Sequence, residues 1–171
     1  MPRKPKGSYT RHTTDWFIGR CAIGGVFFAA GVGNGAAVSL FNDATDGSNL
    51  HLYKLWVQND AAGAYWVTRQ TGALGGTTVT TYPVVSSGAA LWGVISYAAV
   101  PQVIWSPGPF AMPAYIGADN EAGSQDIFAA PGPICVLVPG DSLTVYNPAP
   151  GAISEGYLGV TFYWAVLPDL G

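Results

Sequence analysis

The sequence has few charged residues, and most of its positive charge lies at one end. Asp, Glu, Lys and Arg make up 10% of the 171 residues, against about 25% in an average soluble protein. The last cation is Arg69, so the segment from Gln70 to Gly171 carries acidic residues but no Lys or Arg. Five of the seven cations lie in the first twenty residues. A charge layout of this kind bears on partners more than on fold.

A body with so little charge has a weak electrostatic barrier against association with its own copies. Hydrophobic residues make up 49% of the chain, which is ample for a core and leaves apolar side chains for the surface. We therefore expect other subunits to cover much of the surface, with a homo-oligomer as the first expectation. The alternative is a monomer whose surface is rich in Ser, Thr, Gly and Asn.

Cysteine and histidine are too few and too scattered for a metal centre. Cys21 and Cys135 lie far apart in the sequence, and the two histidines are His12 and His51. A zinc site needs about four such ligands at defined spacing, and no phosphate loop or dinucleotide fingerprint is present. We expect no metal and no cofactor. Two buried free thiols are the default for a chain made in the cytosol, and a Cys21–Cys135 disulfide is the alternative.

No targeting or membrane segment is predicted. The N-terminus is basic, but residues 9–15 are polar where the apolar part of a secretory signal would begin. Cys21 to Phe41 carries no charge and is long enough in principle to span a bilayer of about 30 Å. Its many glycines, and Gly33-Asn34-Gly35 at its middle, instead favour two strands joined by a turn.

Helical periodicity is absent, and short apolar runs rich in β-branched and aromatic residues alternate with Gly- and Pro-containing turns. This pattern predicts one all-β domain over residues 15–171, an antiparallel β-sandwich or jelly roll. The expected strands are Trp16–Cys21, Ile23–Ala30, Ala36–Asn42, Leu50–Gln58, Ala64–Arg69, Thr77–Val84, Leu91–Ala98, Gln102–Trp105, Phe110–Ile116, Gln125–Ala129, Ile134–Val138, Ser142–Asn147 and Tyr157–Leu167.

Three of these strands have a predicted place in the sheets. Leu50–Gln58 is largely apolar on both alternating faces, so we expect a central strand that is covered on both sides. The aromatic run at the C-terminus predicts a central core strand, and the hydroxyl-rich run Thr77–Tyr82 predicts an edge. Val138-Pro139-Gly140-Asp141 predicts a tight turn.

Residues 1–14 form a basic arm with almost no apolar side chain. Such a segment cannot bury a core face, so we expect it to extend from the domain or to lie on a partner. Three alternatives are open for the arm: it binds a nucleic acid, it binds an acidic protein surface, or it binds no partner. Four cations are few for autonomous nucleic-acid binding, because affinity grows with the number of phosphates neutralised. The cations of the arm are Arg3, Lys4, Lys6 and Arg11.

The tetrapeptide Gly140-Asp141-Ser142-Leu143 has the letters of the GDSL esterase motif but lacks the rest of its machinery. No histidine follows Ser142, and a serine hydroxyl without a base is a poor nucleophile at neutral pH. We expect no catalytic residue and no enzyme. The acidic groups of residues 43–49 and 119–126 lack the spacing of a calcium loop and are interpreted as loop residues.

Six Trp, nine Tyr and seven Phe are enough to line a sugar-binding face as well as a core. Aromatic residues beside Gly- and Pro-containing loops are the first candidates for glycan contacts, and these are Trp92, Trp105 and Tyr115. The alternative is that most aromatic side chains fill the core and the subunit interfaces.

Two regions resemble small β-rich virion proteins of tailed bacteriophages. One is a strand, an Asn, a turn with Gly and a second strand, in Val38–Leu52. The other is a Pro-Gly turn before one strand, in Val138–Val145, followed by a closing aromatic strand that includes Val160–Trp164.

The resemblance implies a capsid decoration (cement) protein, a head fibre or a tail accessory protein, typically a trimer on the major capsid shell. We therefore expect a structural, oligomeric protein of the virion, made in the host cytoplasm. Its arm would dock on the major capsid protein or other virion proteins. The alternative function is a glycan- or receptor-binding module of a tail or head fibre.

Overall fold

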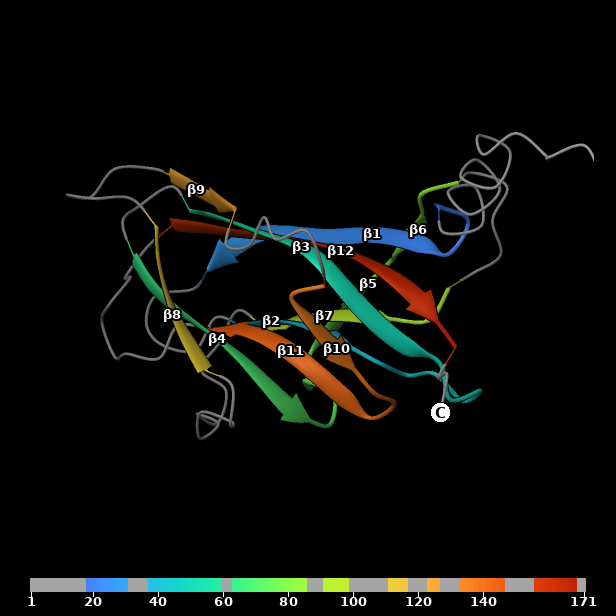
Figure 1. The fold of residues 1–171 in the computed structure, drawn as a ribbon. Coiled ribbons are helices and arrows are strands. Elements are labelled where there is room, and N and C mark those ends of the chain that lie inside the picture. Colours follow the sequence, from blue (N-terminus) through green and yellow to red (C-terminus); the bar gives the residue numbers. More distant parts are fainter. Residues whose placement is uncertain are drawn as a thin grey trace, which may run out of the picture.

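The computed structural model describes residues 18–30, 37–59, 63–85, 91–98, 111–116, 123–126, 133–146 and 156–168. These residues form two antiparallel sheets that pack face to face (Figure 1). The expected antiparallel β-sandwich is confirmed. The arm, residues 1–14, and the expected strand Gln102–Trp105 lie outside the described residues.

Sheet A is the upper layer of Figure 1 and sheet B is the lower layer. Sheet A has the order β10-β3-β12-β1-β6, and β9 pairs with another part of β3. Its strands are β1 (Cys21–Ala30), β3 (Asn49–Asn59), β6 (Tyr82–Pro83), β9 (Gly123–Asp126), β10 (Cys135–Leu137) and β12 (Gly156–Leu167). Sheet B has the order β5-β7-β2-β11-β4-β8. Its strands are β2 (Ala37–Phe41), β4 (Gly63–Thr71), β5 (Thr77–Val79), β7 (Val94–Ala98), β8 (Ala111–Ile116) and β11 (Asp141–Tyr146).

Most connections between successive strands pass from one sheet to the other. The exceptions are β4–β5, β7–β8 and β9–β10. Strands that are distant in sequence therefore pair, with β1 beside β12 in sheet A and β2 beside β11 in sheet B. The predicted central position of the C-terminal strand is confirmed, because β12 lies between β1 and β3.

One hydrophobic core fills the space between the sheets. Sheet A contributes side chains such as Leu55, Phe162 and Trp164, and sheet B contributes Leu40 and Leu143, all of which are fully buried. Burying a side chain of this size stabilises the fold by about 1.5–3 kcal/mol relative to leaving it exposed.

A bulge in β3 decides which of its side chains enter this core. The pairing of β12 with β3 shifts between Tyr163, which lies opposite Lys54, and Trp164, which lies opposite Leu52. Tyr53 is the extra residue of a β-bulge, and such a residue displaces the alternation of the strand by one position. As a result, four apolar residues of β3 all belong to the core, namely Leu50, Leu52, Leu55 and Val57.

The prediction that β3 is largely apolar on both faces is wrong, and the bulge is the reason. Strict alternation places Leu50 and Leu52 on one face and Leu55 and Val57 on the other. With the bulge, the opposite face carries residues that are exposed or half-buried, namely His51, Tyr53, Lys54, Trp56 and Gln58. The strand is central, as predicted, but only its inner face is fully buried.

Trp164 is the largest fully buried side chain and depends on a glycine. Its indole Nε1 donates a hydrogen bond of 2.9 Å to the carbonyl oxygen of Trp92. A Cβ on the next residue, Gly93, would lie 2.9 Å from the indole ring, and Gly93 has a φ of +119°. Only glycine allows both the close approach of the ring and this backbone conformation.

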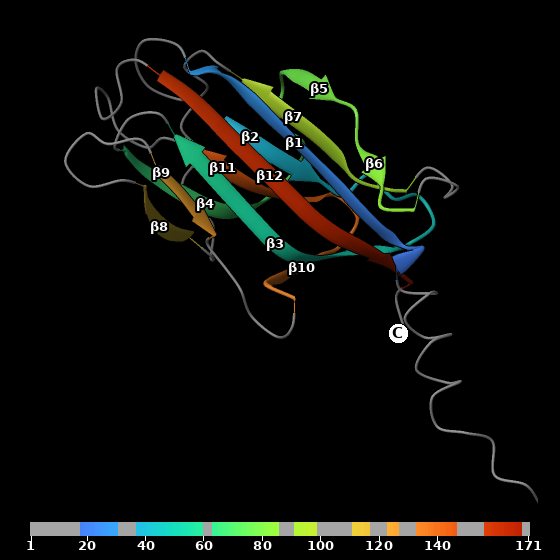
Figure 2. The ribbon, with the colours of Figure 1, turned by 90° about the horizontal axis from the view of Figure 1, so that it is seen from above.

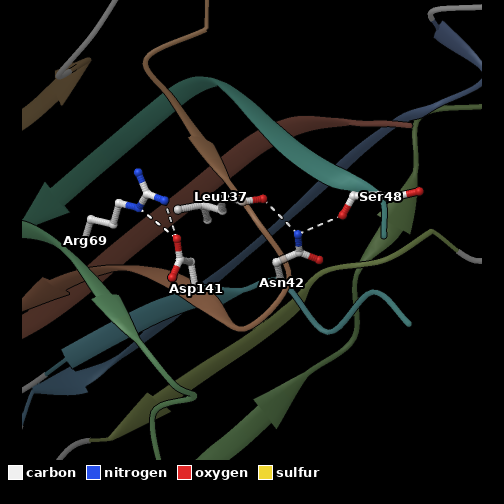
Figure 3. A network of polar contacts seen from close by, with 5 residues as sticks. All are labelled: Asn42, Ser48, Arg69, Leu137 and Asp141. Carbon is white, nitrogen blue, oxygen red and sulfur yellow. Dashed lines mark hydrogen bonds and ion pairs between the residues drawn. The ribbon is translucent and has the colours of Figure 1, made fainter. Parts of the chain in front are cut away.

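Asn42 joins two crossovers between the sheets. One crossover leads from β2 to β3, and the other leads from β10 to β11 through the turn at Pro139 and Gly140. The buried Asn42 side chain donates to the carbonyl oxygens of Ser48, at 3.0 Å, and Leu137, at 2.8 Å (Figure 3). Its Oδ1 accepts a hydrogen bond of 3.0 Å from the Ala44 N–H.

The backbone of Asn42 completes this connection. Its N–H donates to the Asp141 carbonyl oxygen, and its own carbonyl accepts from the Gly140 N–H, both at 2.9 Å. The predicted turn is also confirmed. The Asp141 N–H donates to the Val138 carbonyl at 3.0 Å, and Gly140 has a φ of +90°, as a type II turn with Pro before Gly requires.

Two expected strands differ from the structure. Gly19 and Arg20 form a turn, so the first described strand begins at Cys21, and residues 16 and 17 lie outside the described residues. The run Thr77–Val84 is divided between β5, at an edge of sheet B, and β6, in sheet A. The chain crosses between the sheets at Thr80 and Thr81, which a uniform β-branched pattern does not reveal.

Neither Cys21 nor Cys135 forms a disulfide, and Cys21 is buried whereas Cys135 is half-buried. Cys21 is on β1 and Cys135 is on β10, and β12 and β3 lie between these strands. Three strand spacings of about 4.8 Å separate the two positions by about 14 Å, whereas a disulfide requires Cα atoms within about 7 Å. The alternative of a Cys21–Cys135 disulfide is therefore wrong for this fold. Burial raises the pKa of Cys135 to about 11.

We predict that Asn42→Ala lowers the free energy of unfolding by about 3 kcal/mol, because it leaves buried carbonyl groups without a donor. Urea unfolding followed by tryptophan fluorescence measures this loss. Asp46→Ala is the matched control in the same turn, since Asp46 is exposed and its carboxylate accepts hydrogen bonds from the Ser48 N–H and from the side chains of Ser48 and Trp92. Equal losses for the two variants would contradict the role assigned to Asn42.

Candidate interaction surface

The two outer faces of the sandwich differ in what they offer to a partner. On sheet B, hydroxyl side chains lie opposite one another across five strands, at Thr78, Ser96, Ser39, Thr144 and Thr68. Thr144 Oγ1 donates to Ser39 Oγ at 3.0 Å. Four of these residues are buried, and Thr78 is exposed. Little of this row of hydroxyl groups is therefore available for binding.

The outer face of sheet A is aromatic and partly accessible. The side chains of β1, β3 and β12 that do not enter the core point to this face. Figure 2 views the molecule from this side, with β12, β1 and β3 in front. Its partly or largely exposed aromatic residues are Phe27, Tyr53, Trp56, Tyr82 and Tyr163.

A cluster of neutral groups lies on this face. Cys21 and Tyr163 share a hydrogen bond between their side chains. Burial, this hydrogen bond and the neighbouring Cys21 and Tyr53 raise the pKa of Tyr163 to about 12. Burial likewise raises the pKa of Cys21 and of Tyr53. These three groups are therefore uncharged at physiological pH.

Lys54 is the cation that β3 carries on this face. Its Nζ lies 5.2 Å from the centre of the Trp56 ring, which is within the range of a cation–π interaction. The charge is thereby placed over an aromatic side chain of the same strand. No residue of β1 or β6 is charged, so these two strands present a neutral surface.

Four exposed hydrophobic residues form what we call the apolar strip. Ile23 is 37% exposed and Phe27 is 62% exposed, both on β1. Tyr82, 63% exposed, lies opposite Ile23 in the pairing of β6 with β1. Val84, 43% exposed, follows β6 and donates its N–H to the Cys21 carbonyl at 2.9 Å. Val138, at the Pro139–Gly140 turn, is exposed but lies apart from the strip.

A glycine next to the strip shapes its surface. A Cβ on Gly159 would lie 2.8 Å from the Phe27 ring. The ring therefore lies across the place where another residue would carry its side chain. Phe27 is held on β12 in this way and still presents most of its surface to solvent.

The residues predicted to carry function are placed only in part. Arg3, Lys4, Lys6 and Arg11 of the arm lie outside the described residues, as does Trp105. Tyr115 is on β8, and its side chain is not described. Trp92 is half-buried and packs against the core, which makes it a poor platform for a glycan.

The serine of the GDSL letters is enclosed. Ser142 is fully buried on β11, so a substrate cannot reach its hydroxyl. Asp141 forms an ion pair with Arg69, whose Nε lies 2.9 Å from Asp141 Oδ2 (Figure 3). Arg69, the last cation of the sequence, therefore joins β4 to the start of β11.

Comparisons with known proteins leave the family open. No model of a known protein family matches this chain, and no curated protein matches it as a relative. Among the described residues, no three His, Cys, Asp or Glu side chains come together as a metal site. In the same part of the chain, no helix is long and apolar enough to cross a membrane.

Sequence reasoning missed the apolar strip. Ile23 and Phe27 lie on the same face of β1, but alternation alone does not say which face is the core. The position of Tyr82 beside Ile23 depends on a two-residue strand that follows a crossover, and no short-range signal in the sequence predicts it. The one signal in the sequence is the pair Gly24 and Gly25, because glycine within a strand indicates that another chain segment lies close to it.

We predict that His51 makes the protein less stable as the pH falls. Burial lowers the pKa of His51 from its ordinary value of 6.5, so the unfolded chain takes up a proton that the folded chain resists. Stability is then constant well above pH 6.5 and decreases as the pH falls through that value. Urea unfolding at about pH 7.5 and about pH 5.5 should show a smaller pH effect in His51→Gln, and equal effects in both proteins would contradict the prediction.

Proposed function

We propose that this protein is a structural, non-catalytic component of a bacteriophage particle, an oligomeric decoration protein that binds and stabilises the capsid shell. The observation that carries the proposal is the exposed apolar strip on the outer face of sheet A. Large side chains exposed together in this way are typical of a surface that a partner covers. The resemblance implies a trimer of this kind on the major capsid protein.

The fold and the charge layout support this function. Connections that cross repeatedly between two sheets are typical of jelly rolls, which occur in viral capsid proteins and also in lectins. Arg69, Asp141 and Lys54 already interact within the body. The arm is therefore the natural source of electrostatic attraction to an acidic shell.

We predict that the arm anchors the protein to the particle. Phage particles from a culture of the organism that carries the gene should contain the chain, as mass spectrometry of purified particles would show. Full-length protein should rebind to particles stripped of it. Removal of residues 2–14 should weaken rebinding by at least about tenfold at low salt, because each lost cation removes an ionic contact.

The control for the arm is Asp46→Asn, which changes one charge of the body at an exposed loop residue and should leave rebinding unchanged. The truncated protein should unfold at the same urea concentration as the full chain, because the arm has almost no apolar side chain to add to the core. Rebinding that is unaffected by the truncation would contradict the role of the arm. Absence of the chain from purified particles would overturn the proposed function.

A glycan- or receptor-binding module of a tail or head fibre is the second candidate. Two rings of the apolar strip, Phe27 and Tyr82, are each more than half exposed, and exposed aromatic rings are suitable platforms for sugars. A glycan array with the full chain and with Tyr82→Ala separates the two functions. Binding that is lost in Tyr82→Ala supports this candidate, and no binding counts against it.

A further inference from the structure

A groove lies beside the start of β7, where the chain passes from sheet B to sheet A. The pairing of β5 with β7 ends at Val79. The chain then leaves sheet B through Thr80 and Thr81 and enters β6 (Figure 2). The groove lies between residues 78–81 and 93–94 and has a volume of about 430 Å³, which is within the range of small-molecule sites.

Threonine hydroxyl groups line this groove, and none of its lining residues is charged. The lining residues are Thr78, Val79, Thr80, Thr81, Gly93 and Val94. Thr78 and Thr80 are exposed, so a ligand in solution can reach both side chains. A threonine hydroxyl donates one hydrogen bond and accepts others. The groove therefore offers both kinds of polar group but no counter-charge for an ion.

The contact between Thr81 and Gly93 leaves room for a better hydrogen-bond partner. Thr81 Oγ1 lies 3.5 Å from the Gly93 carbonyl oxygen, whereas a typical O–H···O hydrogen bond is about 2.7–2.8 Å long. Thr81 is half-buried and Gly93 is buried, and polar groups at such depth are costly to leave poorly bonded. A ligand hydroxyl at this point would accept from Thr81 and donate to the Gly93 carbonyl.

Both sides of the groove are held by the rest of the domain. The Gly93 N–H donates a hydrogen bond of 2.8 Å to Asp43 Oδ1, and the Trp164 ring lies against Gly93 from the core. On the other side, Thr81 packs against Gly24 of β1, where a Cβ would lie 3.2 Å from the threonine methyl group. A site that is held in this way loses little conformational entropy when a ligand binds.

We propose that this groove binds one residue of a neutral saccharide. The hydroxyl groups of a sugar match the threonine hydroxyls and the Gly93 carbonyl, and its C–H groups can pack on Val79 and Val94. A phosphate or carboxylate ligand would find no cation in the lining. A purely apolar ligand would remove water from the threonine hydroxyls without replacing its hydrogen bonds.

The inference goes beyond the proposed function, because the free chain binds the sugar whether or not it is part of a particle. It also differs from the second candidate function, which rests on Phe27 and Tyr82 of the apolar strip. Neither residue lines the groove. Failure of sugar binding and absence of the chain from purified particles are therefore separate results.

The experiment screens the full chain on an array of neutral, sialylated and phosphorylated glycans and then titrates the best-bound neutral oligosaccharide by calorimetry. Thr80→Val removes one hydroxyl with little change of shape, so affinity should fall about three- to tenfold. Val94→Phe fills the groove and should abolish detectable binding. Thr77→Val is the matched control, since Thr77 is an exposed residue of β5 outside the lining, and should bind like the natural chain.

A further variant separates the groove from the apolar strip. Tyr82→Ala should bind the sugar like the natural chain, because Tyr82 does not line the groove. Urea unfolding shows whether each variant is folded, and if Val94→Phe is not, Thr80→Val compared with Thr77→Val still decides. No binding to any neutral glycan, a preference for charged glycans, equal affinities for Thr80→Val and Thr77→Val, or loss of binding in Tyr82→Ala alone would each overturn the proposal.

Discussion

The hydrogen bonds of Asn42 are the interaction on which the arrangement of the two sheets depends. A sandwich of this topology must pass the chain from one sheet to the other many times, and each crossover leaves backbone groups without a strand partner. Asn42 satisfies groups of two crossovers at once, at Ser48 and at Leu137. The turns that precede β3 and β11 are thereby held together, although Asn42 and Leu137 lie 95 positions apart in sequence.

In the part of the chain that the structure describes, several charged side chains make contacts within the body. Asp141 binds Arg69 across β11 and β4, and Asp43 accepts a hydrogen bond of 2.8 Å from the Gly93 N–H. Lys54 lies over Trp56. Charges used in this way position strands and turns, while β1 and β6 stay neutral. A neutral surface with exposed aromatic rings suits a protein partner that is itself poor in charge.

The two outer faces of the sandwich differ in what they expose. Sheet B buries a row of hydroxyl groups, whereas sheet A exposes the apolar strip. The difference extends to the edge of sheet A, because β6 is only two residues long and pairs with only two residues of β1.

The sequence alone was sufficient for the fold class, most strands and the turn at Pro139 and Gly140, because alternation and turn residues act over a few positions. It was also sufficient to place most of the positive charge near the N-terminus. The bulge at Tyr53, the division of Thr77–Val84 between the sheets and the meeting of Ile23 with Tyr82 were decided by the tertiary structure. Each depends on which distant strand lies alongside, and that choice is made by packing between the sheets and not by local pattern.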